Sequence, residues 1–271
     1  MSSSPQTVLV VGCGHMGGAM VRQWMTHSSY TLHILNPSKP KADIASKIES
    51  HSENVEGFKD IHFDIVVLAV KPQIIIDVAK TLRPVLDENT LVISIAAGVT
   101  LSSLQAALPH QQPIIRCMPN LPSSIGAGVT AFVTNEKCLS SHTQHAQDLL
   151  SVVGSVHVLD DEQDLHSVTA VSGSGPAYIF HLAECMTDAG MSLGLSHDLA
   201  AQLARETIIG SARLLETNDG TSAEEYRKSV TSKGGTTQAA LEVLMHDDAM
   251  RGLFERALKQ ASERSQELSR S

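Results

Sequence analysis

The sequence lacks several features that would point to particular partners. No apolar run reaches the roughly 18 residues that suggest a membrane-spanning helix. The net charge is −9 and no basic stripe is present, which argues against nucleic acid or an anionic membrane surface as a partner. The first residues, MSSSPQTVLVVG, have no basic segment before their apolar run, so we expect a buried strand there and not a signal peptide.

Residue patterns that bind metals are missing as well. The four cysteines show no CxxC spacing, and the thirteen histidines include no HExxH pair, so we expect no metal site. We interpret the cysteines as small buried apolar residues in a reducing cytoplasm, and we expect the protein to be cytoplasmic. These cysteines are Cys13, Cys117, Cys138 and Cys185.

The first 160 residues alternate short β-branched runs with helical patterns. Runs of this kind are typical of strands buried on both faces of a parallel sheet. The alternation predicts a Rossmann-type, doubly wound α/β sheet, mostly parallel, with extra edge strands. We expect strands at 7–11, 31–35, 63–70, 90–95 and 112–118, helices at 16–27, 39–49, 73–86 and 101–108, and edge strands at 128–135 and 155–159 around a helix at 140–153.

After about residue 163 the strand signals stop, and the pattern predicts an all-helical domain. Pro176 suits a first helical position and Gly190 a helix end. Ser196 and Ser222 are expected N-caps, and Glu225 would complete a capping box with Ser222. We expect helices at 176–189, 197–216, 223–228, 237–245 and 249–268, and we divide the chain into a dinucleotide-binding domain, 1–160, and a helical substrate-binding and dimerisation domain, 161–271.

A glycine motif follows the first expected strand. In VVGCGHMGGAM, Gly12, Gly14 and Gly17 form the pattern GxGxxG between a strand and a helix. Gly12 would allow the tight turn, Gly14 the approach of a pyrophosphate, and Gly17 the close packing of helix on strand. The alternative is a glycine-rich turn without a ligand, but the context favours a dinucleotide site. The cofactor-binding residues expected here are Gly12, Cys13, Gly14, His15, Met16 and Gly17.

The end of the second strand bears on the choice of cofactor. Sites that prefer NAD usually carry Asp or Glu there, whereas this chain has Asn36, Ser38 and Lys39. No carboxylate would repel a 2′-phosphate, so we expect NADPH, with NADH as the alternative. Lys39 could instead simply solvate the start of a helix.

Later strand ends should lie at the same edge of the sheet, beside the cofactor. We therefore count Ala69, Val70, Lys71, Pro72 and Asn120 as cofactor-binding residues. Lys71 is more simply interpreted as a loop lysine near the ribose or a surface charge than as a catalytic residue. For Asn120, which stands between two prolines, a structural hydrogen bond is an equal alternative.

Five segments together resemble a known family. VGCGHMGGAM, LAVKPQ, RCMPNLP, VSGSGPAY and VTSKGGTTQAAL follow one another with the order and spacing of pyrroline-5-carboxylate reductases, over nearly the whole chain. The resemblance implies reduction of 1-pyrroline-5-carboxylate to L-proline by hydride transfer from NADPH or NADH, the last step of proline biosynthesis. It also implies a dimer with intertwined C-terminal domains, which often assembles further into a decamer.

The resemblance implies roles for individual residues. Thr237 matches the threonine that hydrogen-bonds the ring nitrogen, and we take it as the catalytic residue. The substrate-binding residues that the resemblance implies are Ser232, Gly234, Gly235, Thr236, Thr237, Ser174 and Glu162. Three positions depart from the family pattern: Lys233 replaces a usual proline, His166 a common acidic residue, and Glu56 a cofactor-contacting asparagine of some relatives.

Two other functions fit a two-domain plan of this kind. A hydroxyacid or ketopantoate-type dehydrogenase would need a proton donor, usually a lysine of the helical domain. Lys228 and Lys233 are the only lysines there before the last helix. A non-catalytic NADP-sensing module would leave the segment SKGGTT unexplained.

Overall fold

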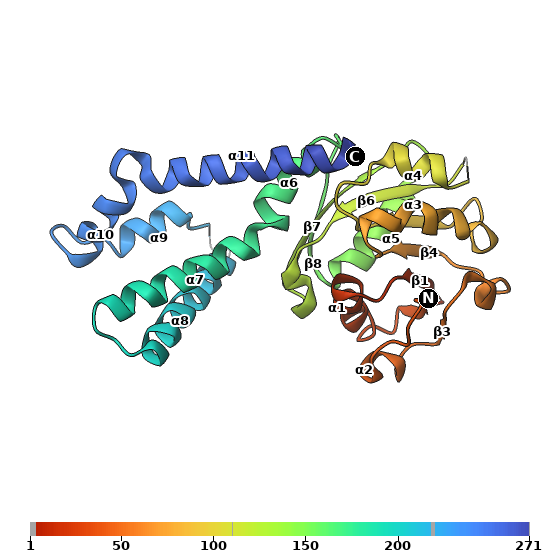
Figure 1. Ribbon diagram of the computed structural model, residues 1–271, viewed down its shortest axis with the longest axis horizontal. Helices are drawn as coiled ribbons and strands as arrows, with labels where there is room; N and C mark the ends of the chain where they lie inside the picture. The colour runs from red at the N-terminus through yellow and green to blue at the C-terminus, as the bar shows by residue number, and fades with distance from the viewer. Residues whose placement is uncertain (1–3, 110, 218–219, 271) are drawn as a thin grey trace. The chain divides into compact units, whose positions relative to one another are not determined.

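The computed structural model describes residues 4–109, 111–217 and 220–270. Its first part is built on an 8-stranded sheet with the order β3-β2-β1-β4-β5-β6-β7-β8 (Figure 1). Neighbouring strands are parallel except for β6 and β7. The prediction of a mostly parallel sheet with extra edge strands is therefore confirmed. The strands are β1 (Gln6–Val11), β2 (Tyr30–Leu35), β3 (Ser50–Ser52), β4 (Ile65–Leu68), β5 (Leu91–Ser94), β6 (Ile114–Met118), β7 (Gly128–Thr134) and β8 (Gly154–Val158).

Helices cover both faces of this sheet because its central strands are apolar on both sides. In β1, Val8 and Val10 face one cluster of buried side chains while Leu9 and Val11 face another. Successive side chains of a strand point to opposite faces, so a continuous apolar run serves two cores. The first cluster is covered by α1 (His15–Trp24) and α5 (Ser140–Ser151), the second by α3 (Pro72–Thr81) and α4 (Leu101–Ala107).

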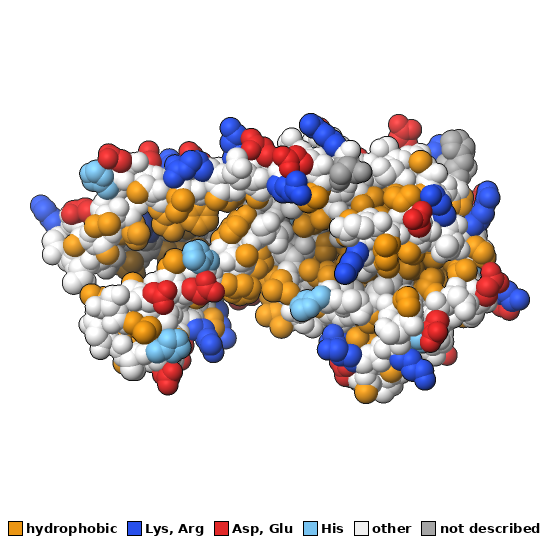
Figure 2. All heavy atoms as spheres, viewed as in Figure 1, with side chains coloured by type: hydrophobic (Ala, Val, Ile, Leu, Met, Phe, Trp, Pro, Cys, Tyr) orange, Lys and Arg blue, Asp and Glu red, His pale blue; other side chains and the backbone are white. Residues whose placement is uncertain are grey.

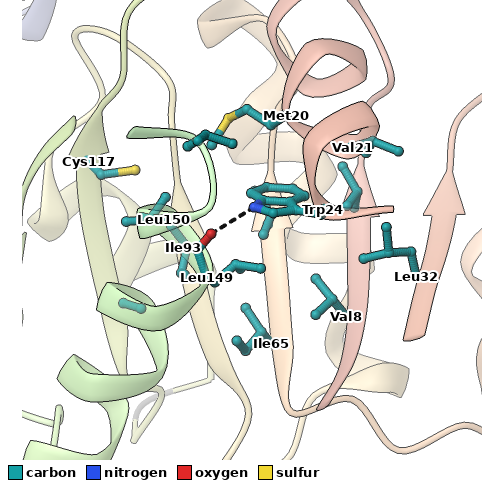
Figure 3. Packing of buried hydrophobic residues seen from close by; sticks show 14 of the residues in the cluster. Val8, Met20, Val21, Trp24, Leu32, Ile65, Ile93, Cys117, Leu149 and Leu150 are labelled. Atoms are coloured by element: carbon teal, nitrogen blue, oxygen red, sulfur yellow. Dashed lines mark hydrogen bonds between the residues drawn. The ribbon is translucent and has the colours of Figure 1, made fainter. Parts of the chain in front are cut away.

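Trp24 links two helices of the first cluster. Its side chain is fully buried, and its indole N–H donates to the carbonyl oxygen of Leu149 in α5 at 2.8 Å (Figure 3). A buried indole N–H without an acceptor would cost about 1–3 kcal/mol. The bond therefore fixes α1, the helix that begins at the glycine motif, against α5.

Some expected elements differ in length. The helix expected at 39–49 is a single turn, α2 (Ala42–Ala45), because Pro40 cannot continue a helix backwards and the chain then leaves to form β3, a polar strand that the sequence pattern did not reveal. The helix expected at 73–86 ends at Thr81, two residues before the turn that contains Pro84. A further short helix, α6 (Asp164–Val168), continues into a π-helical turn, Thr169–Gly173, and was not expected.

The chain packs into two compact units. The first runs to Ser174 and also includes the chain from Ala261 on, whereas the second is Gly175–Gln260. These packing units divide after Ser174, so the division into 1–160 and 161–271 stays a prediction about function. The helix α11 (Ala249–Arg270) begins in the second unit, and its last part belongs to the first.

The second unit is helical, as predicted. Its helices are α7 (Gly175–Ser192), α8 (His197–Glu216), α9 (Ala223–Ser229), α10 (Thr236–Met245) and the first part of α11. Ser196 and Ser222 are N-caps, and Ser222 forms the predicted capping box with Glu225. Figure 1 shows α7 and α8 side by side.

Gly190 was expected to end α7, and this is wrong. The helix continues to Ser192, and Gly194, with φ +96°, occupies the left-handed position after its end. A Cβ atom on Gly190 would lie 3.1 Å from the Cβ of Ala200 in α8. Gly190 therefore serves the close packing of two helices.

Many apolar side chains of the second unit are exposed, and Figure 2 shows hydrophobic side chains between charged ones on its visible face. Leu193, Leu203, Val243, Leu253 and Phe254 are 86%, 48%, 73%, 59% and 40% exposed. Cys185 of α7 is also exposed, contrary to the expectation that all four cysteines are buried. Within the described residues, no helix is long and apolar enough to cross a membrane.

Candidate active site

The glycine turn between β1 and α1 has the steric features that a dinucleotide requires. Gly12 has φ +96°, and a Cβ atom there would lie 2.8 Å from Cγ1 of Val70 and 2.9 Å from the backbone of Ala69. A Cβ on Gly17 would collide with the carbonyl oxygen of Gly12, whereas a Cβ on Gly14 would meet nothing within 4 Å. The turn is thus tight at Gly12, closely packed at Gly17 and open at Gly14, the arrangement that lets a pyrophosphate reach the backbone.

The remaining residues of the turn begin α1. His15 and Met16 are its first two residues, and Gly14 is its N-cap without a side-chain capping bond. The first backbone N–H groups of a helix have no acceptor within the helix, and the helix dipole favours an anion there. These groups could hold the cofactor's phosphates.

Asn36 connects the turn to the loop that follows β2. Its Oδ1 accepts a hydrogen bond from the backbone N–H of Cys13 at 3.1 Å. Its Nδ2 donates to the carbonyl oxygen of Ser38 at 2.7 Å and to the Ser38 hydroxyl at 3.1 Å. The side chain therefore orders two parts of the expected site, which was not predicted for it. Lys39 is exposed next to this loop.

The segment after β4 meets the same turn. Ala69 and Val70 pack against Gly12, and Ala69 also limits the space beside Gly17. Lys71 is the N-cap of α3 and Pro72 its first residue, and both are exposed. Ala69 and Val70 thus shape the turn, and a direct cofactor contact of Lys71 or Pro72 stays a prediction.

A cavity of about 420 Å³ lies beside the glycine turn, and sequence reasoning missed part of its lining. Two basic residues, Arg22 and Lys41, line it together with Cys13, Gly14 and His15. Arg22 is paired with Asp43 at 2.6 Å. The signal for Lys41 was present in the segment SKPK, where the second lysine follows the one that we predicted. Arg22 gave no signal, because its position depends on how α1 packs beside α2.

Asn120 is buried and its side chain is used by the fold. Oδ1 accepts from the backbone N–H of Val129 at 2.9 Å, and Nδ2 donates to the carbonyl oxygen of Ser172 at 3.1 Å. Asn120 therefore joins the start of β7 to the π-helical turn. A cofactor contact at this residue remains a prediction.

In the second unit, the segment SKGGTT forms a loop that opens α10. Gly234 has φ +71°, a left-handed conformation that favours glycine, and Gly235 is the N-cap of α10. A Cβ on Gly235 would lie 2.5 Å from the hydroxyl oxygen of Ser232, whose carbonyl accepts from Gly235 N–H at 3.1 Å. The loop therefore requires glycine at 234, whereas at 235 the Ser232 hydroxyl could turn away from a Cβ atom. Lys233, between Ser232 and Gly234, is exposed.

Thr236 and Thr237 are the first two residues of α10. Thr237 does not cap α10, because the N-cap is Gly235, which makes no side-chain capping bond. The N–H groups of this first turn have no intrahelical acceptor and are free of a capping hydroxyl. Open N–H groups of this kind, together with the helix dipole, favour an anion. Beside them, the Gln238 side chain accepts a hydrogen bond from Gly234 and donates one to Glu242, which the sequence did not reveal.

Glu162 and Ser174 belong to the first unit. Glu162 Oε1 accepts from Nη1 of the buried Arg116 at 2.6 Å and from the backbone N–H of Leu101 at 2.8 Å. Ser174 follows the π-helical turn, and its N–H donates to Thr169. Glu162 thus supports the fold at the start of α4, and substrate contacts of both residues stay predictions. Glu56, which departs from the family pattern, lies exposed in a short 3-10 turn.

His166 has a structural partner. Its Nδ1 lies 2.9 Å from the hydroxyl oxygen of Ser265 in α11, and both residues are buried. Burial lowers the pKa of His166, and the nearby positive charge of Arg116 lowers it further. His166 therefore anchors the last part of α11 as a neutral imidazole. It replaces an acidic residue that is common in the family, but it adds no positive charge at neutral pH.

Comparisons with known proteins cover almost the whole chain. Residues 162–268 match the family model described as pyrroline-5-carboxylate reductase dimerisation, and residues 7–98 match NADP oxidoreductase, coenzyme F420-dependent. The pyrroline-5-carboxylate reductase of Pseudomonas aeruginosa is 38% identical over 98% of this chain and 97% of that protein. The enzyme of Escherichia coli is 34% identical over 96% and 97%.

Solved structures agree. A pyrroline-5-carboxylate reductase structure from Coxiella burnetii superposes with a TM-score of 0.90 at 33% identity, covering 99% of this chain and all of that one. The Plasmodium falciparum pyrroline carboxylate reductase with NADP bound gives a TM-score of 0.85 at 27% identity, with 99% and 100% covered. On these similarities the chain belongs to the pyrroline-5-carboxylate reductase family.

Proposed function

We propose that this chain reduces 1-pyrroline-5-carboxylate to L-proline, with NADPH as the hydride donor. One observation carries the proposal: α10 begins with an uncapped first turn behind two glycines and places Thr237 at its second position. A small ring with one carboxylate and one C=N bond offers an anion for the N–H groups and a nitrogen for the hydroxyl. The whole-chain similarity to named pyrroline-5-carboxylate reductases supports it.

Reduction of a cyclic imine asks little covalent chemistry of a protein. A bound nicotinamide supplies one hydride to the imine carbon, and the nitrogen carries the proton that makes the product a secondary amine. The residues of the chain have to hold the ring and exclude water. In this proposal the first turn of α10 binds the carboxylate, while the Thr237 hydroxyl hydrogen-bonds the ring nitrogen and fixes which face is exposed to the hydride.

NADPH is proposed in preference to NADH because the residues after β2 carry no carboxylate. Asn36, Ser38 and Lys39 lie there, and Lys41 adds a second positive charge beside the glycine turn. These positive charges would attract the 2′-phosphate of NADPH, whereas the uncharged 2′-hydroxyl that NADH carries at the same position would gain little. The fit of the glycine turn to a pyrophosphate is common to both cofactors.

We propose a homodimer through the helical unit, and further assembly of dimers into a decamer. The exposed leucines of α8 and α11 support the dimer, because contiguous apolar surface on a soluble protein marks interaction sites. The matched dimerisation family model supports it as well. The four free cysteines support the cytoplasm as the proposed compartment.

The decisive experiment is a steady-state assay of NADPH oxidation with 1-pyrroline-5-carboxylate and, in parallel, with 2-keto acids. We expect turnover with the imine and none with the keto acids. Turnover with a keto acid alone would favour a hydroxyacid-type dehydrogenase. Binding of NADPH without turnover of any substrate would favour the NADP-sensing module. The ratio of kcat/KM for NADPH and NADH in the same assay tests the cofactor preference.

A further inference from the structure

The side chain of Gln238, the third residue of α10, is hydrogen-bonded to the loop that precedes the helix. Its Oε1 accepts a hydrogen bond of 2.7 Å from the backbone N–H of Gly234, and its Nε2 donates to Oε1 of Glu242 at 2.9 Å. The amide orientation is fixed by these partners, because the flipped amide would set two donors against each other at Gly234 and two acceptors at Glu242. The two bonds link Glu242 in α10, through Gln238, to Gly234 in the loop before the helix.

The helix α9 shows what α10 lacks. In α9 the N-cap Ser222 accepts from the N–H of Glu225, the third helical residue, whose carboxylate bonds back to Ser222. In α10 the N-cap is Gly235 and the third helical residue is Gln238. Two changes are therefore combined at α10: the capping hydroxyl is missing, and the usual carboxylate is a neutral amide.

Both changes leave the first turn of α10 less well satisfied. A glycine N-cap forgoes the hydrogen bond of a capping hydroxyl, at only a small cost in stability, and a neutral amide forgoes the attraction between a carboxylate and the helix dipole. Without them the first-turn N–H groups stay open and the positive end of the helix keeps its charge. Gln238 still accepts from the N–H of Gly234, which in this exposed left-handed turn would otherwise have only water as an acceptor.

We propose that Gln238 is a positioning and specificity-determining residue for the substrate carboxylate. It fixes the Gly234 turn through a hydrogen bond. It also keeps the first turn of α10 free of negative charge, so that the substrate carboxylate is the only anion there. This inference rests on the proposed function, which places the carboxylate at the first turn of α10.

Two variants separate the hydrogen bond from the charge. In Gln238→Glu the acceptor for Gly234 is kept, one negative charge is added next to the carboxylate, and the donor to Glu242 is lost, a loss that the double variant described below repairs. Like charges at close range repel strongly, so KM for 1-pyrroline-5-carboxylate should rise roughly tenfold or more, with KM for NADPH unchanged. In Gln238→Met the acceptor is lost without a charge, and kcat/KM should fall roughly fivefold, as for one neutral hydrogen bond.

The double variant Q238E/E242Q is the sharpest test. It keeps the composition, the net charge and the chain of hydrogen bonds, because the carboxylate introduced at position 238 can accept both from Gly234 and from the amide introduced at position 242. It moves the negative charge one turn toward the loop. We expect KM for the imine to stay raised, and the increase to shrink with added salt, which screens charge but leaves a packing defect unchanged.

The matched control is Q144E/D148N on α5, where Gln144 Nε2 donates to Asp148 four residues later at 2.8 Å, the same spacing as between Gln238 and Glu242. It should leave KM at the wild-type value.

The outcomes are separable. Wild-type turnover with an unchanged KM in Gln238→Glu, or a KM restored in Q238E/E242Q, would overturn this inference alone. An increase in KM that does not change with salt concentration would also overturn it, because the effect would then be one of packing. A wild-type chain that does not oxidise NADPH with the imine would overturn the proposed function and this inference with it.

Discussion

The side chain of Asn36 accepts a hydrogen bond of 3.1 Å from the backbone N–H of Cys13, and so joins the loop after β2 to the glycine turn after β1. The same side chain donates to Ser38 through its Nδ2. One neutral amide therefore orders both the turn expected to bind the pyrophosphate and the loop expected to bind the ribose. Its role is to position these loops, whatever direct contact it also makes.

This arrangement sharpens a prediction about cofactor choice. Asn36→Asp loses both donors to Ser38 and adds a negative charge, so KM for NADPH should rise about tenfold or more relative to that for NADH. Asn36→Ala loses the hydrogen bonds without adding charge, and should weaken both cofactors about equally, roughly fivefold. Steady-state kinetics with each cofactor measure this. Equal losses for both cofactors in Asn36→Asp would mean that this loop does not sense the 2′-phosphate.

Thr237 provides the test of the proposed chemistry. A hydrogen bond to a charged group is worth about 1.5–3 kcal/mol. Thr237→Ala should therefore lower kcat/KM for the imine about 10- to 150-fold. Thr237→Ser, which keeps the hydroxyl, should recover most of the activity, and KM for NADPH should barely change. Because Gly235 is the N-cap, the alanine variant should lose little stability. A near-normal kcat/KM would show that the substrate has been misplaced.

Glu162 separates support of the fold from substrate binding. Its partner Arg116 is only 4% exposed, and removal of one member of such a pair leaves a buried charge unpaired. Glu162→Ala should lower the free energy of unfolding by about 3 kcal/mol. Urea denaturation measures the loss, and the double variant Arg116→Met with Glu162→Ala should recover part of it. A stable Glu162→Ala protein with a raised KM for the imine would instead assign Glu162 to the substrate.

Assembly through the helical unit can be tested on α8. Leu203 is 48% exposed, and we expect the second chain to cover it. Leu203→Lys would bury a charge in the proposed interface and should shift the protein toward monomers with reduced activity. Gln202→Lys, at an exposed polar position of the same helix, is the control. Sedimentation that finds wild-type protein stable, active and monomeric at micromolar concentration would reject the dimer.

Acid should destabilise the protein through His33. Its ring is buried beside Phe58 and Phe63, and burial lowers its pKa below the ordinary 6.5. The folded state then binds fewer protons than the unfolded state, so this contribution to stability is complete above the unfolded pKa. It is lost as the pH falls from about 6.5 toward the folded pKa, by at most about 1.4 kcal/mol per pH unit for one histidine. Unfolding free energies measured from pH 8 to pH 5 should fall less steeply in His33→Gln than in wild type, whereas His27→Gln at an exposed position should keep the wild-type slope. Parallel slopes for all three proteins would show that His33 does not titrate in this range.

Local patterns in the sequence were enough for the order and type of most elements. Alternating apolar runs predicted the strands, because a strand buried on both faces has no polar positions. The helix His197–Glu216 and its cap Ser196 could be predicted for a similar reason, since capping involves residues three positions apart. The roles of Gly12, Gly14 and Gly17 follow from the sterics of a single turn. Such features involve neighbours in the chain, and the residue types report them directly.

Contacts between distant residues were decided only by the tertiary structure. Arg116 and Glu162 are 46 positions apart, and His166 and Ser265 are 99 apart. No spacing rule connects such pairs, since their partners are chosen by how strands and helices pack. Gly190 shows the same: its residue type suggested a helix end, but the approach of Ala200 in α8 decides its role. The sequence by itself determined most of the elements and which turns can accept an anion, because backbone sterics and capping are local. The strand β3 and the helix α6 appeared only in the structure. Three features depend on burial, which only the packed chain decides. They are the antiparallel pairing of β7 with β6, the basic residues that line the cavity beside the glycine turn, and the partners of each buried polar group.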